Sequence, residues 1–206
     1  MIYPEQPILS RALPDIADST LVGSWLTHKT PSSGKDYSTV GNDGVSTGIK
    51  WNKIGGYFDG ASYLNMTGGT FTGIDTVEFW FKTSGAGSMC IINDFRTNRS
   101  VYINGGKINF RNSDNSANLA TANTFNDNAW HYGLVNIEND LIYLDGEVEA
   151  TEAGDGLASD RILIGARHSG GYGSYFIGDL ACLNAYATPK SASFAKYRYL
   201  QCVPEG

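Results

Sequence analysis

Hydrophobic and polar residues alternate along short stretches of the chain, and this pattern predicts β-strands. The alternation is clearest from Thr76 to Thr83, where Val77, Phe79 and Phe81 lie at every second position. Successive side chains of a strand point to opposite faces, so these three residues are predicted to face a core. Roughly a dozen such stretches follow one another at short spacing, with turn residues between them.

Two turn signals predict hairpins. Residues 101–103 and 107–110 are rich in apolar side chains and flank the Asn-Gly-Gly sequence at 104–106. Asn and Gly tolerate the positive φ angles of a tight hairpin turn. A second hairpin is predicted within 131–144, where the polar residues 138–140 separate two apolar runs.

A helical pattern is found only near the C-terminus. Ser191 or Ser193 is predicted to cap a short helix that carries Phe194, Tyr197 and Leu200 on one side. Many short strands without alternating helices argue against a parallel sheet. The predicted fold class is therefore all-β, with two antiparallel sheets packed face to face and a short C-terminal helix.

Length and composition fit one domain. The chain has 206 residues, of which 41% are hydrophobic and 17% charged, a composition that excludes general disorder. Residues 1–20 hold three of the six prolines and have no regular period. We predict an extended N-terminal arm over 1–20 and a sandwich domain over 21–206; a frayed terminus is the alternative for the arm.

Charge and chain ends limit the classes of partner. The net charge is −6 and the sequence has no run of Lys or Arg, which argues against nucleic acid. No stretch is long and apolar enough to span a bilayer, and residues 1–7 lack the basic start of a signal peptide. We expect synthesis in a cytoplasm. Cys90 and Cys182 are predicted to be buried thiols, with a Cys182–Cys202 bridge left open.

The order of motifs adds a resemblance. The segments that carry it, in sequence order, are 21–25, 36–44, 56–64, 76–82, 130–132, 142–146, 162–165 and 176–180. This series resembles the laminin G-like, concanavalin A-like jelly rolls, particularly those of phage and bacterial surface proteins. The resemblance implies a jelly-roll sandwich. Members of this family bind sugars, proteins or calcium, or decorate a particle.

Catalytic patterns are missing from the sequence. The glycosidases of this fold would require a Glu-x-Asp-x-x-Glu strand motif, and the nearest approach is Glu138-Asn139-Asp140, which lacks the final Glu and is predicted to be a solvated turn. The histidines His28, His131 and His168 have no metal-binding spacing, and we expect His131 to be hydrogen-bonded for structural reasons. We expect no enzyme activity.

Calcium is a predicted structural cofactor. The ion prefers several hard oxygen ligands, which loop Asp and Asn residues supply. Asp36, Asn42 and Asp43 lie in a polar connection, and Asp179 follows Gly178 in a late strand. The resemblance implies that the Asp of the Asp/Gly loop and the late Asp can share one ion, so Asp36, Asp43 and Asp179 are the candidate ligands.

A carbohydrate site is predicted in the polar, aromatic and glycine-rich loop 167–175. Sugars stack on aromatic rings while polar groups bind their hydroxyls. The candidate residues are Arg167, His168, Tyr172 and Tyr175, with Trp80 as a further aromatic. The alternative is a mobile loop, with Trp80 packed under another segment.

These observations lead to three functional hypotheses. The first is a non-catalytic virion module, such as a phage head-decoration, fibre or tail component, made in the host cytoplasm. Its arm would dock to other virion proteins, and it could also bind surface glycans. The second is a free carbohydrate-binding module or lectin, cytoplasmic or surface-associated, and the third, disfavoured, is a glycoside hydrolase. A homo-oligomer would protect the sheet edges.

Overall fold

A computed structural model describes residues 18–26, 34–94, 99–111, 118–151 and 157–201. Most of the predicted arm, residues 1–17, lies outside these ranges, as does Cys202. None of the helices in the described ranges has the length and apolar character needed to cross a membrane.

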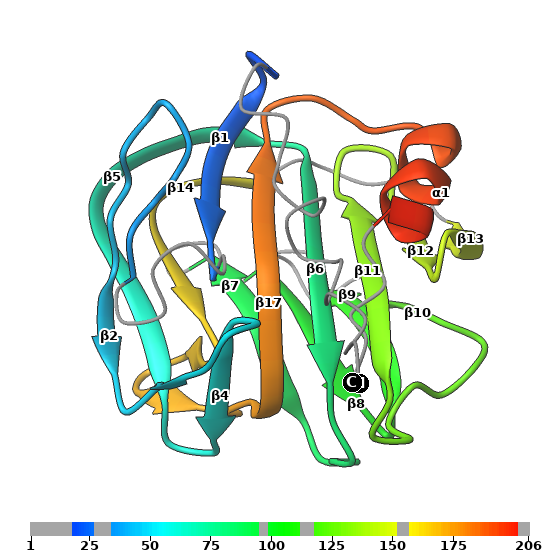
Figure 1. The fold of residues 1–206 in the computed structure, drawn as a ribbon, viewed down its shortest axis with the longest axis horizontal. Helices are drawn as coiled ribbons and strands as arrows, with labels where there is room; N and C mark the ends of the chain where they lie inside the picture. The colour runs from blue at the N-terminus through cyan, green and yellow to red at the C-terminus, as the bar shows by residue number, and fades with distance from the viewer. Residues whose placement is uncertain (1–17, 27–33, 95–98, 112–117, 152–156, 202–206) are drawn as a thin grey trace, which may run out of the picture.

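Two antiparallel sheets pack face to face, and this confirms the predicted sandwich (Figure 1). In the described ranges, the sheet at the front of Figure 1 has eight strands in the order β13-β12-β11-β6-β17-β4-β3, with β1 also paired to β17. Its strands are β1 (Leu21–Trp25), β3 (Lys50–Trp51), β4 (Gly56–Asp59), β6 (Thr76–Lys82), β11 (Trp130–Asn136), β12 (Leu141–Leu144), β13 (Glu147–Thr151) and β17 (Ile177–Tyr186).

The back sheet has seven strands within the described residues, in the order β10-β9-β8-β7-β14-β5-β2. They are β2 (Val45–Thr47), β5 (Tyr63–Ile74), β7 (Met89–Asp94), β8 (Ser100–Asn104), β9 (Lys107–Arg111), β10 (Asn118–Ala120) and β14 (Leu157–Ile164). A separate hairpin pairs β15 (Arg167–His168) with β16 (Tyr172–Gly173), and the helix α1 spans Ala192–Gln201.

The core lies between the two sheets. Val77, Phe79 and Phe81 are completely buried on the inner face of β6, as their alternation predicted. Ile103 on β8 and Ile162 on β14 face them from the back sheet and belong to the same apolar cluster. Burial of these side chains supplies the main stabilisation of the sandwich.

Both predicted hairpins are present. Asn104 pairs with Lys107, and Gly105 and Gly106 between them have φ angles of 60° and 80°. These positive values explain the two glycines, because a side chain would be strained there. The second hairpin joins β11 to β12, and Asp140 in its turn has a φ of 43°. Glu138 and Asn139 in this turn are exposed, as predicted for a solvated turn, but Asp140 is buried.

Helix α1 covers part of the outer face of the front sheet (Figure 1). Ser191 caps it, since its hydroxyl accepts a hydrogen bond from the Phe194 backbone N–H at 3.3 Å. Of the three apolar residues predicted on one side, Phe194 packs against the cluster beneath the helix, whereas Tyr197 and Leu200 are 57% and 66% exposed. Ala195 and Arg198 are buried. The small side chain of Ala195 permits close approach to the sheet, and Arg198 reaches a buried partner.

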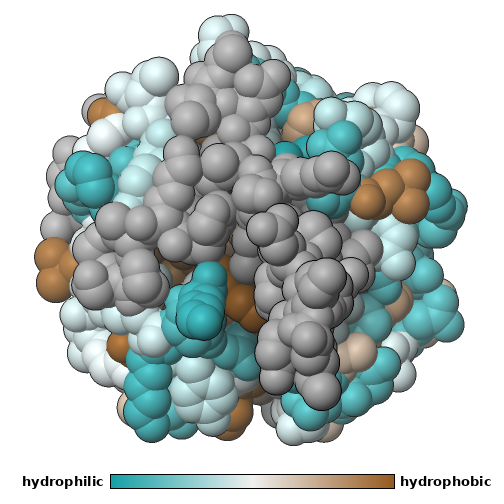
Figure 2. All heavy atoms as spheres, viewed as in Figure 1, coloured by the Kyte–Doolittle hydropathy of each residue, from teal (hydrophilic) through white to brown (hydrophobic). Residues whose placement is uncertain are grey.

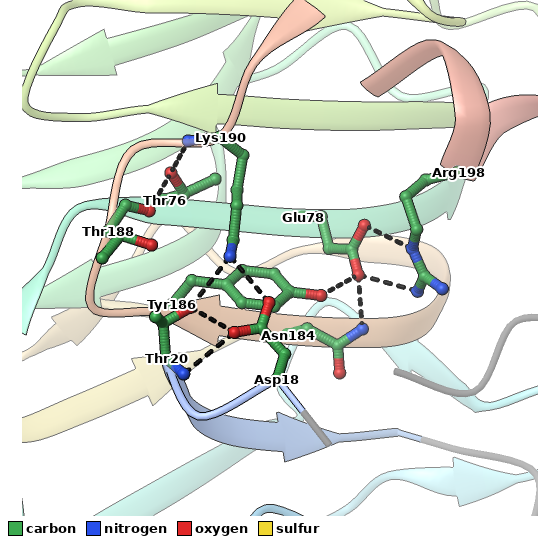
Figure 3. Close-up of polar contacts among 9 residues, drawn as sticks. All are labelled: Asp18, Thr20, Thr76, Glu78, Asn184, Tyr186, Thr188, Lys190 and Arg198. Carbon is green, nitrogen blue, oxygen red and sulfur yellow. Dashed lines mark hydrogen bonds and ion pairs between the residues drawn. The ribbon is translucent and has the colours of Figure 1, made fainter. Parts of the chain in front are cut away.

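That partner is Glu78, which points from β6 toward the helix (Figure 3). Its carboxylate accepts hydrogen bonds from Arg198 Nη2 at 2.8 Å, Arg198 Nε at 3.0 Å and Asn184 Nδ2 at 2.7 Å. The hydroxyls of Tyr132 and Tyr186 also donate to it, both at 2.7 Å. Burial raises the pKa of Glu78, but the charge of Arg198 and the hydrogen bonds from Arg198 and both tyrosines lower it by more, so the pKa lies below its ordinary value.

The described end of the predicted arm lies on the sandwich itself. Lys190 Nζ contacts Asp18 Oδ2 at 2.7 Å and Thr20 Oγ1 at 2.8 Å (Figure 3). The Lys190 backbone N–H donates to Thr76 Oγ1 at 3.1 Å. These contacts tie the start of β1 to the segment that leads into α1.

The visible surface has a mixed character. Figure 2 shows the described hydrophobic residues of this face in small separate spots among polar ones. Such scattered exposure is ordinary for a protein surface and marks no docking area by itself.

Candidate functional site

The hairpin β15–β16 forms the predicted loop at one end of the sandwich. In Figure 1 it is the yellow-orange segment at the lower left, between β14 and β17 in the chain. Arg167 pairs with Gly173 and His168 with Tyr172. The His168 backbone N–H donates to the side-chain oxygen of buried Asn93 at 3.0 Å, which fixes the hairpin to β7.

A tyrosine from a different strand completes an aromatic surface on this hairpin. The rings of Tyr63 and Tyr172 are stacked, with centroids 4.6 Å apart and planes 19° apart. Tyr175 lies 6.5 Å from Tyr63, and the His168 ring meets Tyr172 edge-on at 5.5 Å. Tyr172 remains 39% exposed. The structure therefore brings together four of the five predicted residues, including Arg167, and adds Tyr63.

A pocket of about 340 Å³ opens beside these rings. Its lining consists of small, polar or aromatic residues and one cation: Arg167, Ser169, Gly170, Gly171, Tyr172, Gly173 and Ser174. The volume falls within the range of small-ligand sites. Backbone groups, hydroxyls and a guanidinium suit a ligand with many hydroxyl groups.

Trp80 does not belong to this site, so its predicted role is corrected. It is 2% exposed and lies on the front sheet beneath α1. Its ring stacks on Tyr199 with centroids 6.1 Å apart, and it contacts Tyr132 at 5.4 Å. The alternative that Trp80 packs under another segment is confirmed, because the helix covers this part of the outer face.

The buried carboxylate of Asp36 organises its own loop. Its Oδ1 accepts hydrogen bonds from the backbone N–H groups of Ser24 and Ser38, both at 2.8 Å. Its Oδ2 accepts the Ser38 hydroxyl at 2.8 Å and the Asn42 N–H at 2.7 Å. Four donors therefore surround the carboxylate, and positively polarised hydrogens occupy the positions that a cation would need.

The other two candidate calcium ligands have different surroundings. Asp43 Oδ1 accepts the Asp36 N–H at 2.9 Å, whereas Asp179 Oδ1 accepts from Asn52 at 3.0 Å. Ser24, whose N–H group binds Asp36, pairs with Asn184 on β17. Asp179 lies five residues before Asn184 on the same strand, which corresponds to roughly 16 Å along a regular strand. In the described part of the chain no group of three His, Cys, Asp or Glu side chains is arranged to hold a metal. These residues do not fit the predicted shared ion.

His131 has two carboxylate partners. Its Nδ1 lies 2.8 Å from Asp145 Oδ2, and its Nε2 lies 3.0 Å from Asp127 Oδ1. Burial lowers the pKa of His131, but the hydrogen bonds with Asp145 and Asp127 raise it by more. The prediction of a hydrogen-bonded structural histidine is confirmed. The contacts of His131 with Asp145 and Asp127 also join the turn after β12 to the loop before β11.

Several receptor-binding domains of botulinum neurotoxins are among the solved structures that resemble this fold. The botulinum neurotoxin serotype D ligand-binding domain, solved in complex with N-acetylneuraminic acid, is 15% identical over 88% of this chain, with a TM-score of 0.63. The type G receptor-binding domain is also 15% identical, with a TM-score of 0.65. A type C structure, from work on cell entry through two ganglioside molecules, is 13% identical with a TM-score of 0.67.

The chain spans only 50–51% of these three structures, and at such identities the likeness shows the fold alone. No curated protein matches the chain. A laminin G-like family model, described as "Concanavalin A-like lectin/glucanases superfamily", matches residues 52–193. This match covers more than half of the chain and agrees with the jelly-roll sandwich and with the resemblance seen in the motifs. The chain therefore belongs to the concanavalin A-like lectin/glucanase superfamily.

Proposed function

We propose that this domain is a carbohydrate-binding module and that it binds glycans at the β15–β16 hairpin. The observation that carries the proposal is the half-exposed Tyr172 ring, stacked on Tyr63 beside a polar pocket. A sugar presents an apolar ring face and a rim of hydroxyls. An aromatic surface next to clustered polar groups matches both parts.

Tyr63 makes this surface more rigid than a glycine-rich loop alone would be. It is the first residue of β5, and its neighbour Leu64 is fully buried in the core. Side chains alternate along a strand, so Tyr63 points outward beneath the hairpin. Stacking on Tyr63 holds Tyr172 in place before a ligand arrives, which reduces the entropy lost on binding.

We propose a binding role rather than a hydrolytic one. Hydrolysis of a glycosidic bond requires two carboxyl groups on opposite sides of the bond, roughly 5–10 Å apart. The residues that line the described pocket include an arginine, serines, glycines and a tyrosine, and none of them is Asp or Glu. Glu138 and Asp140, the nearest match to the glucanase motif, lie in the β11–β12 turn.

Proteins with the same fold support a role in carbohydrate binding. The superfamily includes both lectins and glucanases. One similar toxin domain was solved in complex with N-acetylneuraminic acid, and cell entry of another toxin depends on interaction with two ganglioside molecules. Attachment to a virion stays a prediction, because the arm residues on which it depends lie outside the described ranges.

A panel of immobilised glycans, measured with and without calcium, tests the proposal. The wild-type protein should bind at least one class, and Tyr172→Ala should weaken that binding about tenfold through loss of the stacking surface. Tyr197→Ala is the matched control, since it removes an exposed tyrosine from α1. Absence of binding across the panel, or equal losses in both variants, would refute the proposed function.

A further inference from the structure

Beside the β15–β16 hairpin, which carries Arg167, the outer face of the back sheet carries another arginine. Arg111 lies at the end of β9, and its guanidinium carbon is 5.4 Å from the centroid of the Tyr102 ring on β8. The flanking Val101 and Ile103 are in the core, so Tyr102 faces outward. Arg111 pairs with Ser100, which lies two residues before Tyr102 and shares its face.

The hairpin pocket and this arginine are neighbours through β7. The Cys90 backbone N–H donates to the carbonyl of Ser174, a residue of the pocket wall, at 2.7 Å. Cys90 is also the cross-strand partner of Tyr102, over which Arg111 is stacked. Strands lie about 4.8 Å apart, so the pocket wall and Arg111 are separated by little more than two strand spacings.

The positive charges of Arg111 and Arg167 therefore act on each other beside the pocket that Arg167 lines. Burial lowers the pKa of Arg167, and the positive charge of Arg111 lowers it further. The Nε atom of Arg111 is buried and has no hydrogen-bond partner in the described part of the chain. A buried donor without a partner costs free energy. An anion beside Arg111 would accept a hydrogen bond from this atom and would be attracted by the positive charges of both arginines.

We propose that Arg111 and Arg167 form an anion subsite next to the tyrosine surface, and that it selects glycans bearing a carboxylate. This inference rests on the proposed glycan-binding function and specifies its ligand class. A planar carboxylate matches the forked donors of a guanidinium, whereas neutral sugars offer only single hydroxyls. The stacked tyrosines would hold the apolar face of the same or an adjacent sugar.

The overall charge sharpens the inference. The chain has a net charge of −6, which repels acidic ligands at long range. Recognition of a carboxylate must then depend on local contacts with these two side chains. Binding should weaken with added salt, since part of the pair is exposed to solvent.

Titration calorimetry with matched acidic and neutral sugars tests the subsite. The probes are 3′-sialyllactose against lactose, and oligogalacturonate against the same oligomer with its carboxyl groups reduced. At least one acidic probe should bind about tenfold or more tightly than its neutral counterpart. Arg111→Gln and Arg167→Gln should each abolish that preference, and Arg111→Lys should restore it only in part because the fork is lost.

Lys107→Gln is the matched control, because it removes one positive charge from the same strand as Arg111. It should leave the preference unchanged, and thermal melting should verify that every variant is folded. Equal affinity for acidic and neutral probes, or a preference that survives both arginine variants, overturns the anion subsite but leaves glycan binding intact. Failure to bind any probe or any glycan of the panel overturns the proposed function as well.

Discussion

Arg198 on α1 contacts Glu78 on β6 at 2.8 Å, and both side chains are almost completely excluded from solvent. This contact is a buried polar anchor between the helix and the front sheet (Figure 3). Glu78 lies on the face of β6 opposite to Val77 and Phe79, where an exposed polar residue would be expected from the alternation. The helix covers that face and converts a surface glutamate into a buried one.

Removing the charge of Glu78 should destabilise the domain strongly. Glu78→Gln leaves the Arg198 guanidinium buried without a counter-ion, so the free energy of unfolding should fall by about 3 kcal/mol or more. Glu78→Gln combined with Arg198→Met should recover part of this loss, since no unpaired charge remains. Urea denaturation of the wild-type protein, Glu78→Gln, Arg198→Met and the double variant measures these losses. Strictly additive losses in the double variant would show that the two side chains do not act as a pair.

His131 should make stability depend on pH. Its hydrogen bonds with Asp145 and Asp127 raise its pKa in the folded state above the ordinary value of 6.5. Protonation therefore favours folding, and the contribution is complete below pH 6.5 and lost as pH rises through the folded-state pKa. His131→Gln should lower the free energy of unfolding by about 1 kcal/mol more at acidic than at alkaline pH.

Asp127→Asn should show the same pH dependence in a weaker form, because it removes one of the two carboxylate partners of His131. Denaturation at several pH values between acidic and alkaline conditions measures both variants. A loss in His131→Gln that does not change with pH would contradict the assigned role of the histidine.

Asp36 should stabilise its loop without a metal ion. Asp36→Asn replaces one acceptor oxygen by an NH₂ group that faces donors, so we expect a loss of about 2 kcal/mol in the free energy of unfolding. Calcium should leave the melting temperature of the wild-type protein unchanged, as should a chelator. A bound ion at 100 times its Kd would add about 2.7 kcal/mol. A rise of several degrees with calcium, absent in Asp36→Asn, would reinstate the predicted calcium site.

Local sequence patterns predicted the parts of the fold that depend on neighbours in the chain. The two glycines at 105 and 106 predicted the β8–β9 turn, and the alternation of Val77, Phe79 and Phe81 predicted the core face of β6. The position of α1 depends on a tertiary contact between residues 120 positions apart, Glu78 and Arg198. For that reason the sequence pattern did not reveal that Glu78 and Arg198 are buried, or that α1 is the segment that covers Trp80.

The candidate site was predictable in its loop but not in its partners. The glycines and aromatic residues of 167–175 identified the hairpin. Tyr63 and Arg111 come from β5 and β9, and only the strand order of the back sheet brings these segments near it. The sequence did carry one signal for the outward position of Tyr63 and Arg111. Each lies next to a residue of the core, Leu64 or Phe110, and neighbouring side chains of a strand point to opposite faces.

The most direct test of glycan binding at the β15–β16 hairpin is a two-dimensional ¹H–¹⁵N NMR titration with the sugar that binds most tightly in the panel. The largest amide shifts should fall in residues 167–175 and around Tyr63 and Arg111. Tyr172→Ala should reduce these shifts at equal ligand concentration. Shifts confined to α1, to the front sheet or to the 36–44 loop would contradict a binding site at the β15–β16 hairpin.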